Sequence, residues 1–288
     1  MAETWTPLRL LSWTQGYFAQ KGVDAPRLTA ELLLAHALSC DRVRLYLDFD
    51  KPMAEADLAA FRELVRRRVE REPTAYLTRR KEFFGRPFQV DPRVLVPRPE
   101  TELVLEAALA ALPPGGQALD LGTGSGVLAI SLALERPGAA VIATDVSPEA
   151  LEVARENGAR LGAAGVTFLA GDLYDPVPPG ARFHVIVSNP PYVPRGELDT
   201  LPPEVRREPR LALDGGDDGL AISRRIVAGA PGRLHSGGAL VLEMHESHED
   251  ALPSLCLQCG FARAEPRRDL AGRPRLVVAH VAGEPGPA

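Results

Sequence analysis

The chain has 288 residues, 45% of them hydrophobic and 25% charged, and a net charge of -5. These values are average for globular proteins; they exclude a disordered or fibrous chain and give no support to nucleic-acid binding. No stretch approaches the roughly 18 apolar residues of a membrane span, the first residues lack the pattern of a signal peptide, and three cysteines do not make a disulfide framework. We therefore expect a soluble, cytoplasmic protein of two domains, without membrane or nucleic-acid partners. We also expect a monomer, although composition does not determine the oligomeric state.

Residues 1–72 are predicted to form a small helical domain. Apolar residues recur there at helical spacing, as in Leu28, Leu32, Leu33 and Ala37. The tripeptide Asp24-Ala25-Pro26 is typical of a helix start, because proline is tolerated in the first turn. The basic run at residues 66–71 is typical of a solvated helix face.

Between residues 73 and 101 the pattern changes to short β-branched and aromatic pieces broken by proline and glycine. Examples are Phe83-Phe84-Gly85 and the stretch at residues 93–97. We interpret this region as a linker with a β-hairpin. Residues 100–112 return to helical spacing, and the Pro-Pro-Gly-Gly sequence at residues 113–116 ends that helix.

Residues 102–288 alternate strand-like with helical stretches and are predicted to form the larger, α/β domain. Apolar runs at residues 118–121, 140–143, 166–169, 184–187 and 239–242 indicate a mostly parallel sheet covered by helices on both faces. Two final runs, near residues 261–264 and 275–281, have no long helix between them and indicate antiparallel strands. Residues 283–288 are predicted to fray.

The segment Asp120-Leu121-Gly122-Thr123-Gly124-Ser125-Gly126 lies where the first of these strands turns into a helix. Glycines at such a turn let the backbone approach a ligand closely. A dinucleotide fingerprint would need glycine at Val127, and a phosphate loop would need Gly-Lys-Ser/Thr; neither is present. The segment is therefore predicted to be a cofactor turn of another kind.

Asp145 ends the second strand about twenty residues beyond this turn, where a carboxylate can accept hydrogen bonds from both hydroxyls of a ribose. Alternatively, Asp145 begins the turn before a helix that starts at Ser147-Pro148-Glu149, and it could do both. Asp172 follows the third strand and also fits a simple turn.

The glycine spacing, opened by an acidic residue, resembles the loop of class I S-adenosylmethionine methyltransferases. This resemblance implies a Rossmann-like, seven-stranded, mostly parallel sheet with one antiparallel strand, and S-adenosylmethionine as cofactor. It also implies that Asp120 faces the cationic amino end of the cofactor and that Asp172 and Leu173 contact its adenine. No metal is expected, because Cys256 and Cys259 lack two further ligands at a familiar spacing.

The fourth strand runs into Asn189-Pro190-Pro191-Tyr192, and ligands of open α/β sheets bind beyond the carboxyl ends of strands. Two prolines stiffen the segment, so the Asn189 side-chain oxygen and the Pro190 carbonyl can act as a fixed pair of acceptors for an NH2 group. Such a pair orients a planar amide or amine nitrogen toward a sulfonium methyl and favours the positive charge that develops. Tyr192 would supply an aromatic wall. The alternative is a Pro-Pro turn capped by asparagine.

Asn-Pro-Pro-Tyr is shared by enzymes that methylate adenine or cytosine amino groups, guanine in ribosomal RNA, or glutamine side chains. The flanking segments resemble the HemK/PrmC family, glutamine methyltransferases that act on the Gly-Gly-Gln motif of bacterial class I peptide chain release factors. Besides the two motifs above, the matching stretches are Pro73-Thr-Ala-Tyr76-Leu, Glu82-Phe83-Phe84-Gly85, Val94-Leu-Val-Pro97-Arg98-Pro99-Glu100-Thr101-Glu102, Glu208-Pro209-Arg-Leu-Ala-Leu-Asp-Gly215-Gly216 and Asp269-Leu-Ala-Gly-Arg273.

The resemblance implies that residues 1–72 dock a release factor, that Phe83 helps to wall the glutamine pocket and that Arg98 borders the active site. Ordinary packing, or an ion pair that holds a carboxylate, is the alternative for both side chains. A sister enzyme that methylates a ribosomal-protein glutamine and, less closely, a nucleic-acid amino methyltransferase remain rival assignments. The chain departs from the family at Arg79, where glycine is common, at Glu243-Met-His245, where Glu-x-Gly is usual, and at His248, which replaces a common glutamine.

Overall fold

The computed structural model describes residues 4–283, so the fraying predicted for residues 283–288 falls almost wholly outside the described residues. The chain divides into two compact units. Unit 1 consists of residues 1–80 and 202–207, and unit 2 of residues 81–201 and 208–288. Within residues 4–283, none of the helices combines the length and the apolar character needed to cross a membrane.

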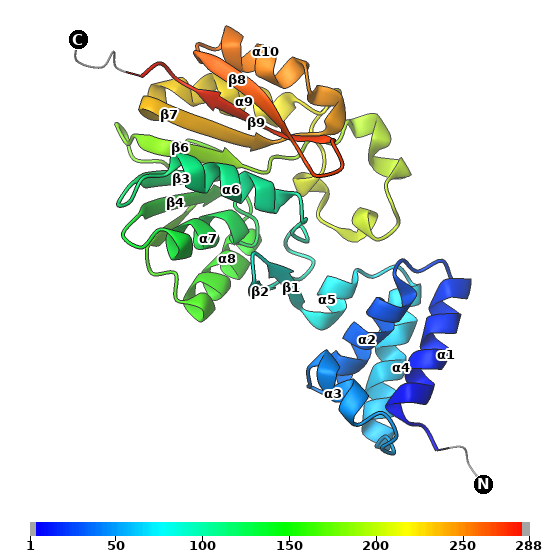
Figure 1. The fold of residues 1–288 in the computed structure, drawn as a ribbon. Coiled ribbons are helices and arrows are strands. Elements are labelled where there is room, and N and C mark those ends of the chain that lie inside the picture. Colours follow the sequence, from blue (N-terminus) through cyan, green and yellow to red (C-terminus); the bar gives the residue numbers. More distant parts are fainter. Residues whose placement is uncertain (1–3, 284–288) are drawn as a thin grey trace. The chain divides into compact units, whose positions relative to one another are not determined.

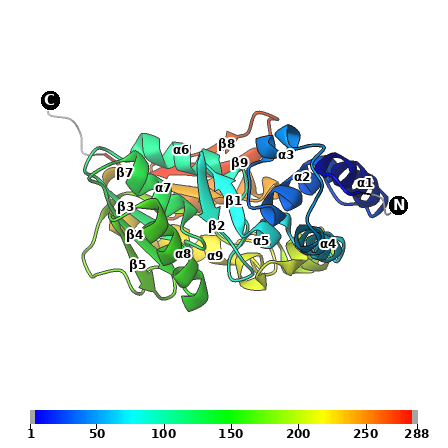
Figure 2. The same ribbon diagram turned by 90° about the horizontal axis from the view of Figure 1, so that it is seen from below.

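Unit 1 is a bundle of helices around its own apolar core. Its helices are α1 (Pro7–Gln20), α2 (Pro26–Ala37), α3 (Arg42–Leu47), α4 (Glu55–Val69) and the short α5 (Thr74–Thr78). Helices α1, α2 and α4 run side by side in Figure 1, and α1 and α4 are seen nearly end-on in Figure 2. Phe18, Leu33 and Phe61 are almost completely buried where they meet.

The buried face of α2 differs from the one that the leucine spacing suggests. Leu28 is 42% exposed and Leu32 36% exposed, whereas Ala30, Leu33 and Leu34 are fully buried. A helix with leucines on several sides does not define a single apolar stripe, so the packing of the neighbouring helices selects the face that is buried. Helix α5 is a second difference, since it lies within the predicted linker.

The segment Pro202–Arg207 belongs to unit 1 although it is far away in the sequence. Its Glu204 accepts hydrogen bonds from Arg68 at 2.9 Å and from Arg71 at 3.2 Å. Arg68 is only 4% exposed. The prediction that residues 66–71 form a solvated face is therefore wrong for Arg68, because a carboxylate from a distant segment neutralises the buried guanidinium.

Unit 2 contains a hairpin and a large sheet. The hairpin, within the predicted linker, consists of β1 (Arg80–Phe83) and β2 (Arg86–Gln89), whereas residues 93–97 form no strand. The sheet has seven strands in the order β5-β4-β3-β6-β7-β9-β8, and β9 is antiparallel to both its neighbours. This confirms the predicted fold class. The strands are β3 (Gln117–Leu121), β4 (Ala140–Asp145), β5 (Val166–Ala170), β6 (Phe183–Ser188), β7 (Leu234–Glu243), β8 (Arg263–Arg268) and β9 (Pro274–His280).

Alternate residues of the central strands face opposite layers of helices. Ala118 and Val185 pack with α6 (Thr101–Ala111) and α7 (Val127–Glu135), and α8 (Pro148–Leu161) lies next to α7 against β4 and β5. Leu119 and Ile186 pack on the other face with α9 (Ala221–Gly229) and α10 (Ala251–Gln258). Strands buried on both faces explain the nearly continuous apolar runs in the sequence.

Candidate active site

The parallel strands β3, β4 and β6 end at the same edge of the sheet. Leu121 pairs with Thr144 across β3 and β4, and Asp120 pairs with Val187 across β3 and β6. The Ser188 hydroxyl also donates a hydrogen bond to the Leu121 carbonyl at 2.6 Å. The three segments singled out in the sequence, which follow these strands, therefore meet in space.

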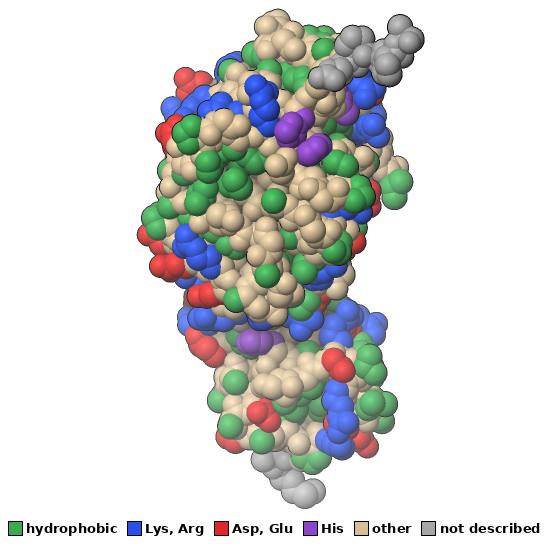
Figure 3. All heavy atoms as spheres, turned by 90° about the vertical axis from the view of Figure 1, so that its left-hand side faces the viewer, with side chains coloured by type: hydrophobic (Ala, Val, Ile, Leu, Met, Phe, Trp, Pro, Cys, Tyr) green, Lys and Arg blue, Asp and Glu red, His purple; other side chains and the backbone are tan. Residues whose placement is uncertain are grey.

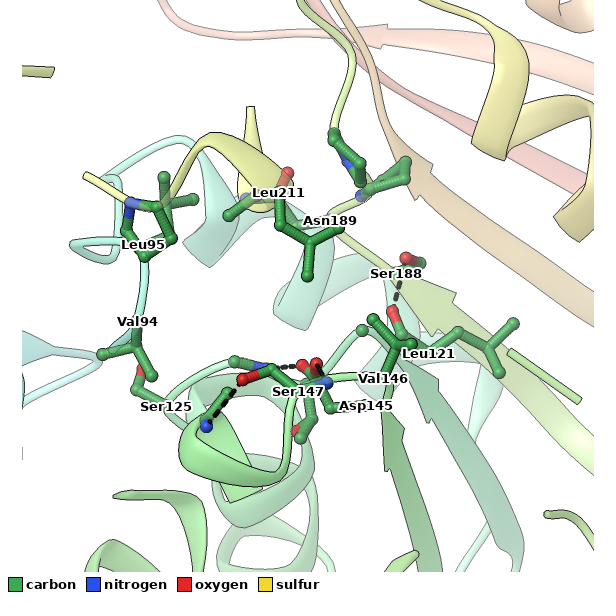
Figure 4. Close-up of a pocket in the computed structure, with 18 of the residues that line it drawn as sticks. Val94, Leu95, Leu121, Ser125, Asp145, Val146, Ser147, Ser188, Asn189 and Leu211 are labelled. Atoms are coloured by element: carbon green, nitrogen blue, oxygen red, sulfur yellow. Dashed lines mark hydrogen bonds between the residues drawn. The ribbon is translucent and has the colours of Figure 1, made fainter. Parts of the chain in front are cut away.

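A cavity lies at this edge of the sheet, within unit 2. Figure 4 shows Leu95 and Leu211 on one side of it and Asp145 and Ser147 on the other. Gly126 and Tyr192 are predicted site residues that are not part of the lining. The predicted residues that do line the cavity are Asp120, Gly122, Thr123, Gly124, Ser125, Asp145, Asp172, Leu173, Asn189, Pro190 and Pro191.

The turn between β3 and α7 has a left-handed backbone that favours glycine. Gly122 has a φ of 71° and Gly124 a φ of 56°, and a Cβ atom added at either position would meet no atom within 4 Å. Side chains at these positions would thus project into open space at the cavity wall. Glycine keeps that space for a ligand that approaches the backbone.

Asp120 is a buried carboxylate with one oxygen left over. Its Oδ2 accepts hydrogen bonds from the Thr123 hydroxyl at 2.6 Å and from the Ala129 N–H at 3.2 Å. Among the described residues its Oδ1 is buried and has no hydrogen-bond partner. Burial raises the pKa of this carboxyl to about 7. A cationic ligand group at Oδ1 would satisfy the atom and offset the cost of its ionisation.

Asp145 holds two turns together. Its Oδ2 accepts from the Gly124 N–H at 2.8 Å, and its Oδ1 accepts from the Ser147 N–H at 2.9 Å. Ser147 in turn caps α8, because its hydroxyl accepts from the Ala150 N–H at 3.1 Å. Burial raises the pKa of the Asp145 carboxyl. The structural role foreseen for Asp145 is thus present, and each carboxylate oxygen can still accept a second hydrogen bond.

Asp172 and Leu173 lie at the cavity on the segment after β5. The Asp172 carboxylate forms an ion pair with Arg225 at 2.8 Å, and its side chain is 44% exposed. Leu173 has a left-handed backbone with a φ of 49° and packs against the core beneath α9. The pair therefore combines an open carboxylate with an apolar surface.

The Asn189 side chain is held by a chain of hydrogen bonds to a buried carboxylate. Its Nδ2 donates to the Thr101 hydroxyl oxygen at 3.2 Å, and that hydroxyl donates to Oε2 of Glu243 at 2.7 Å. The Tyr192 hydroxyl donates to Oε1 of the same carboxylate at 3.1 Å. Thr101 on α6 and Glu243 at the end of β7 are both nearly inaccessible. Tyr192 thus lies behind Asn189, and its ring centre is 6.2 Å from that of His245.

Burial gives this group of side chains unusual proton affinities. It raises the pKa of Glu243 to about 7. Burial, together with the charge of Glu243, also raises the pKa of Tyr192. The Tyr192 hydroxyl therefore keeps its proton at neutral pH and serves as a donor to the carboxylate.

The other two predicted substrate contacts lie outside the cavity lining. Phe83 is 1% exposed and packs edge-on against Phe88, with ring centres 6.0 Å apart. Arg98 donates to the carboxylate of Glu208 at 2.6 Å, and the same carboxylate accepts from the Val96 N–H at 3.0 Å. The alternatives stated for these residues, core packing and an ion pair, describe their positions.

Several residues at the site escaped sequence reasoning. Val94, Leu95 and Leu211 supply apolar surface to the cavity, and Thr101 and Glu243 support Asn189. Val94, Leu95, Thr101 and Leu211 lie in stretches that match the family, and Glu243 lies in the Glu243-Met-His245 departure, but no chemical pattern marked any of the five as a site residue. The buried polar pair gave no signal, because threonine and glutamate are common at a helix start and after a strand.

Comparison with known proteins identifies the family. Residues 9–78 match the PrmC N-terminal domain, and residues 99–201 match the methyltransferase small domain. A release factor glutamine methyltransferase of Geobacter sulfurreducens is 45% identical over 276 residues, which cover 96% of each chain. The chain belongs to the release factor glutamine methyltransferase family. Another member, from Rhodopirellula baltica, is 44% identical and covers 96% of this chain and 98% of its own.

Solved structures extend this likeness to the fold. A 16S rRNA N2 G1207 methyltransferase of Thermus thermophilus, solved with AdoMet and guanosine, superposes with a TM-score of 0.53 at 23% identity. The match covers 70% of this chain and 49% of that one. At this identity the likeness concerns the fold alone, and a shared fold does not determine the substrate.

Proposed function

We propose that this member of the release factor glutamine methyltransferase family transfers the methyl group of S-adenosylmethionine to the side-chain amide nitrogen of the glutamine in the Gly-Gly-Gln motif of class I peptide chain release factors. The observation that carries the proposal is that the glycine turn after β3 and the Asn189-Pro190 pair after β6 line one cavity. A methyl donor and a methyl acceptor bound to these two segments would be neighbours.

The glycine turn and the acidic strand ends suit S-adenosylmethionine. The Oδ1 of Asp120, which has no hydrogen-bond partner among residues 4–283, would accept from the methionine ammonium, and Gly122 and Gly124 would let the ligand approach the backbone. Asp145 would accept from the ribose hydroxyls, while Asp172 and Leu173 would meet the adenine edge and face. Bound there, the cofactor supplies a methyl group activated by its sulfonium.

Asn189 and Pro190 suit an amide acceptor. An amide nitrogen is a weak nucleophile because its lone pair is delocalised into the carbonyl. The Asn189 Oδ1 and the Pro190 carbonyl would each accept one N–H of the NH2 group, orient the nitrogen in line with the methyl group and favour the developing positive charge. Val94, Leu95 and Leu211 would keep water from the reacting atoms. The transfer would leave S-adenosylhomocysteine and a methylated nitrogen that loses one N–H proton to solvent as the product departs, so no general base is required during the transfer.

The proposal assigns protein docking to unit 1. Its surface presents large apolar side chains, among them Leu8 at 55% exposed, Trp13 at 53% and Val43 and Leu47 at 67%. Apolar surface of this kind is typical of protein interfaces, where aromatic residues are enriched. A release factor bound there would add affinity that a short Gly-Gly-Gln peptide lacks. The enzyme would act on it as a monomer in the cytoplasm.

A protein acceptor fits the charge of the chain better than a nucleic acid. The net charge is -5, and on the face drawn in Figure 3 the Lys and Arg side chains are interspersed with Asp and Glu. A phosphate backbone is held by concentrated positive charge. A ribosomal-protein glutamine presents the same NH2 group as a release factor, so it is the rival that the assay must exclude.

The test is methyl transfer with radiolabelled S-adenosylmethionine. We expect label in a class I release factor, none in its variant with alanine for the glutamine of Gly-Gly-Gln, and none in purified ribosomal proteins. The intact factor should also have a much lower KM than a peptide that carries only the motif. Labelling of the alanine variant, or preferential labelling of a ribosomal protein, would overturn the assignment.

A further inference from the structure

The role of Asn189 depends on which end of its amide faces the cavity. The oxygen can only accept hydrogen bonds, and the nitrogen can only donate them. The two ends have nearly the same size, so shape alone does not select the orientation. An acceptor site for NH2 requires the oxygen toward the cavity.

The ionised carboxylate of Glu243 determines this orientation. It only accepts hydrogen bonds, and it takes one from Tyr192 at 3.1 Å and one from Thr101 at 2.7 Å. A threonine hydroxyl has a single hydrogen, so Thr101 can only accept from its remaining partner. That partner is Asn189, at 3.2 Å, which must therefore present its NH2 to Thr101.

We propose that Thr101 and Glu243 are positioning residues that hold Asn189 with its oxygen toward the cavity, so that the site selects an NH2 group over a group that offers lone pairs. This rests on the proposed function, because an NH2 acceptor is what gives the orientation its purpose. It predicts that a glutamate in place of the target glutamine is excluded, since a carboxylate would face an oxygen.

Protonation of Glu243 reverses the direction of the hydrogen bonds that join Glu243, Thr101 and Asn189. A neutral carboxyl can donate to Thr101, which then donates to Asn189 and turns the asparagine nitrogen toward the cavity. Burial raises the pKa of Glu243 to about 7; Glu100 raises it further, whereas the Arg98 guanidinium opposes the rise. Arg275 lies 3.5 Å from Glu100, and His245 follows two residues after Glu243 in the chain. Turnover is therefore expected to fall as the pH drops below about 7.

Two substitutions at Thr101 separate the hydroxyl from the shape of the side chain. Thr101→Val keeps the shape and removes the hydroxyl, whereas Thr101→Ser keeps the hydroxyl and serves as the matched control. With saturating S-adenosylmethionine, kcat should fall about tenfold in Thr101→Val, the effect of losing one buried hydrogen bond, and stay within about twofold in Thr101→Ser. The KM for the cofactor should not change in either. Equal kcat in both variants and the native enzyme would overturn the inference.

Glu243→Gln tests the direction of these hydrogen bonds. The amide has the same shape but cannot offer two acceptors, so kcat at high pH should fall about as much as in Thr101→Val. With saturating S-adenosylmethionine, which keeps Asp120 ionised, the loss of kcat below pH 7 should also disappear, because the group that titrates between Thr101 and Tyr192 has been removed. A purely packing role would leave the pH profile of kcat unchanged, and that result would contradict a positioning role.

A spectroscopic measurement keeps this inference separate from the proposed function. The side-chain NH2 signal of Asn189 can be assigned as the one lost in Asn189→Asp, and its hydrogen exchange can be followed by NMR in ¹⁵N-labelled protein. Slow exchange in the native enzyme and Thr101→Ser, and fast exchange in Thr101→Val, support the positioning role even if no release factor is methylated. Fast exchange in the native enzyme refutes that role whatever the substrate is.

Discussion

Asp120→Asn is the substitution that probes cofactor recognition most directly. The asparagine oxygen can still accept from Thr123 and Ala129, so the fold of the turn is kept. Its NH2 then takes the position of Oδ1 and faces the cofactor ammonium with a donor in place of an acceptor. A hydrogen bond between charged groups contributes about 1.5–3 kcal/mol, so S-adenosylmethionine should bind roughly 10- to 150-fold more weakly.

The pH dependence of binding gives a second measure of the same contact. Burial raises the pKa of Asp120 to about 7, and the cofactor ammonium requires the ionised form. Affinity should therefore be about eightfold weaker at about pH 6 than at about pH 7.5, and Asp120→Asn should lose this dependence. Isothermal titration calorimetry measures both. The control is Glu106→Gln, which removes one negative charge from an exposed position on α6.

The same substitution should stabilise the enzyme without cofactor. A carboxyl whose pKa rises from 3.8 to about 7 on folding stabilises the protein below pH 3.8, and this contribution is lost as the pH rises through 7. The loss amounts to roughly 4 kcal/mol. The buried amide nitrogen of the variant would itself lack a hydrogen-bond partner, so the substitution should recover only about half of this free energy. Thermal unfolding at about pH 8 should then occur several degrees higher in Asp120→Asn. Affinity within twofold of the native value, or no rise in the unfolding temperature, would refute the reasoning.

Three further substitutions address the acceptor, the turn and a family departure. Asn189→Ala should lower kcat about 100-fold while the Kd for S-adenosylmethionine stays within about twofold, which steady-state kinetics and calorimetry measure. An equal loss of cofactor affinity would contradict the role of Asn189 as an acceptor for the substrate NH2. Gly124→Ala should lower the free energy of unfolding by about 1 kcal/mol, because its φ is 56°. It should also weaken cofactor binding about tenfold, since the added methyl group projects into the cavity. An unchanged Kd in calorimetry would argue against a ligand that lies close to this turn. Arg79→Gly should raise the free energy of unfolding by up to about 1 kcal/mol, because Arg79 has a φ of 52°, and denaturant titration showing a decrease would contradict it.

The sequence predicts the fold of unit 2 well because its physical signal is local. Each strand is a short apolar run, and strands buried on both faces need no partner information to be recognised. The face of α2 was not predictable in this way, since leucines such as Leu28 and Leu32 would suit a core as well as the solvent. The place of Pro202–Arg207 in unit 1 was not predictable either, because Glu204 and Arg68 are 136 residues apart.

In the candidate site, too, local features could be predicted from the sequence and long-range contacts could not. Backbone requirements are visible in the sequence, and Gly122 and Gly124 of the turn and the two prolines after Asn189 line the cavity. The side chains that hold Asn189 in place could not be recognised from the sequence. The hydrogen bond from Thr101 to Glu243 joins two residues that are distant in the sequence and common in such positions. The surroundings of the aromatic residues were not predictable for a related reason: the burial of Phe83 and the hydrogen bond from Tyr192 to Glu243 depend on neighbours that no local pattern reveals.

Two of the buried carboxylates at and behind the cavity, Asp120 and Glu243, are not explained by stability. Asp120 and Glu243 each have a pKa raised to about 7 by burial, so each costs free energy of folding at neutral pH. An apolar residue or an amide of similar shape would avoid that cost, as replacements of buried charges in other proteins do. Their positions are explained if Asp120 pairs with the ammonium of the cofactor and Glu243 orients the Asn189 amide. In that case cofactor binding should lower the pKa of Asp120 and leave that of Glu243 almost unchanged, a difference that carboxyl ¹³C titration with and without S-adenosylmethionine would detect. Equal shifts at both carboxyls would mean that the two groups respond to a general change in solvation and have no separate tasks.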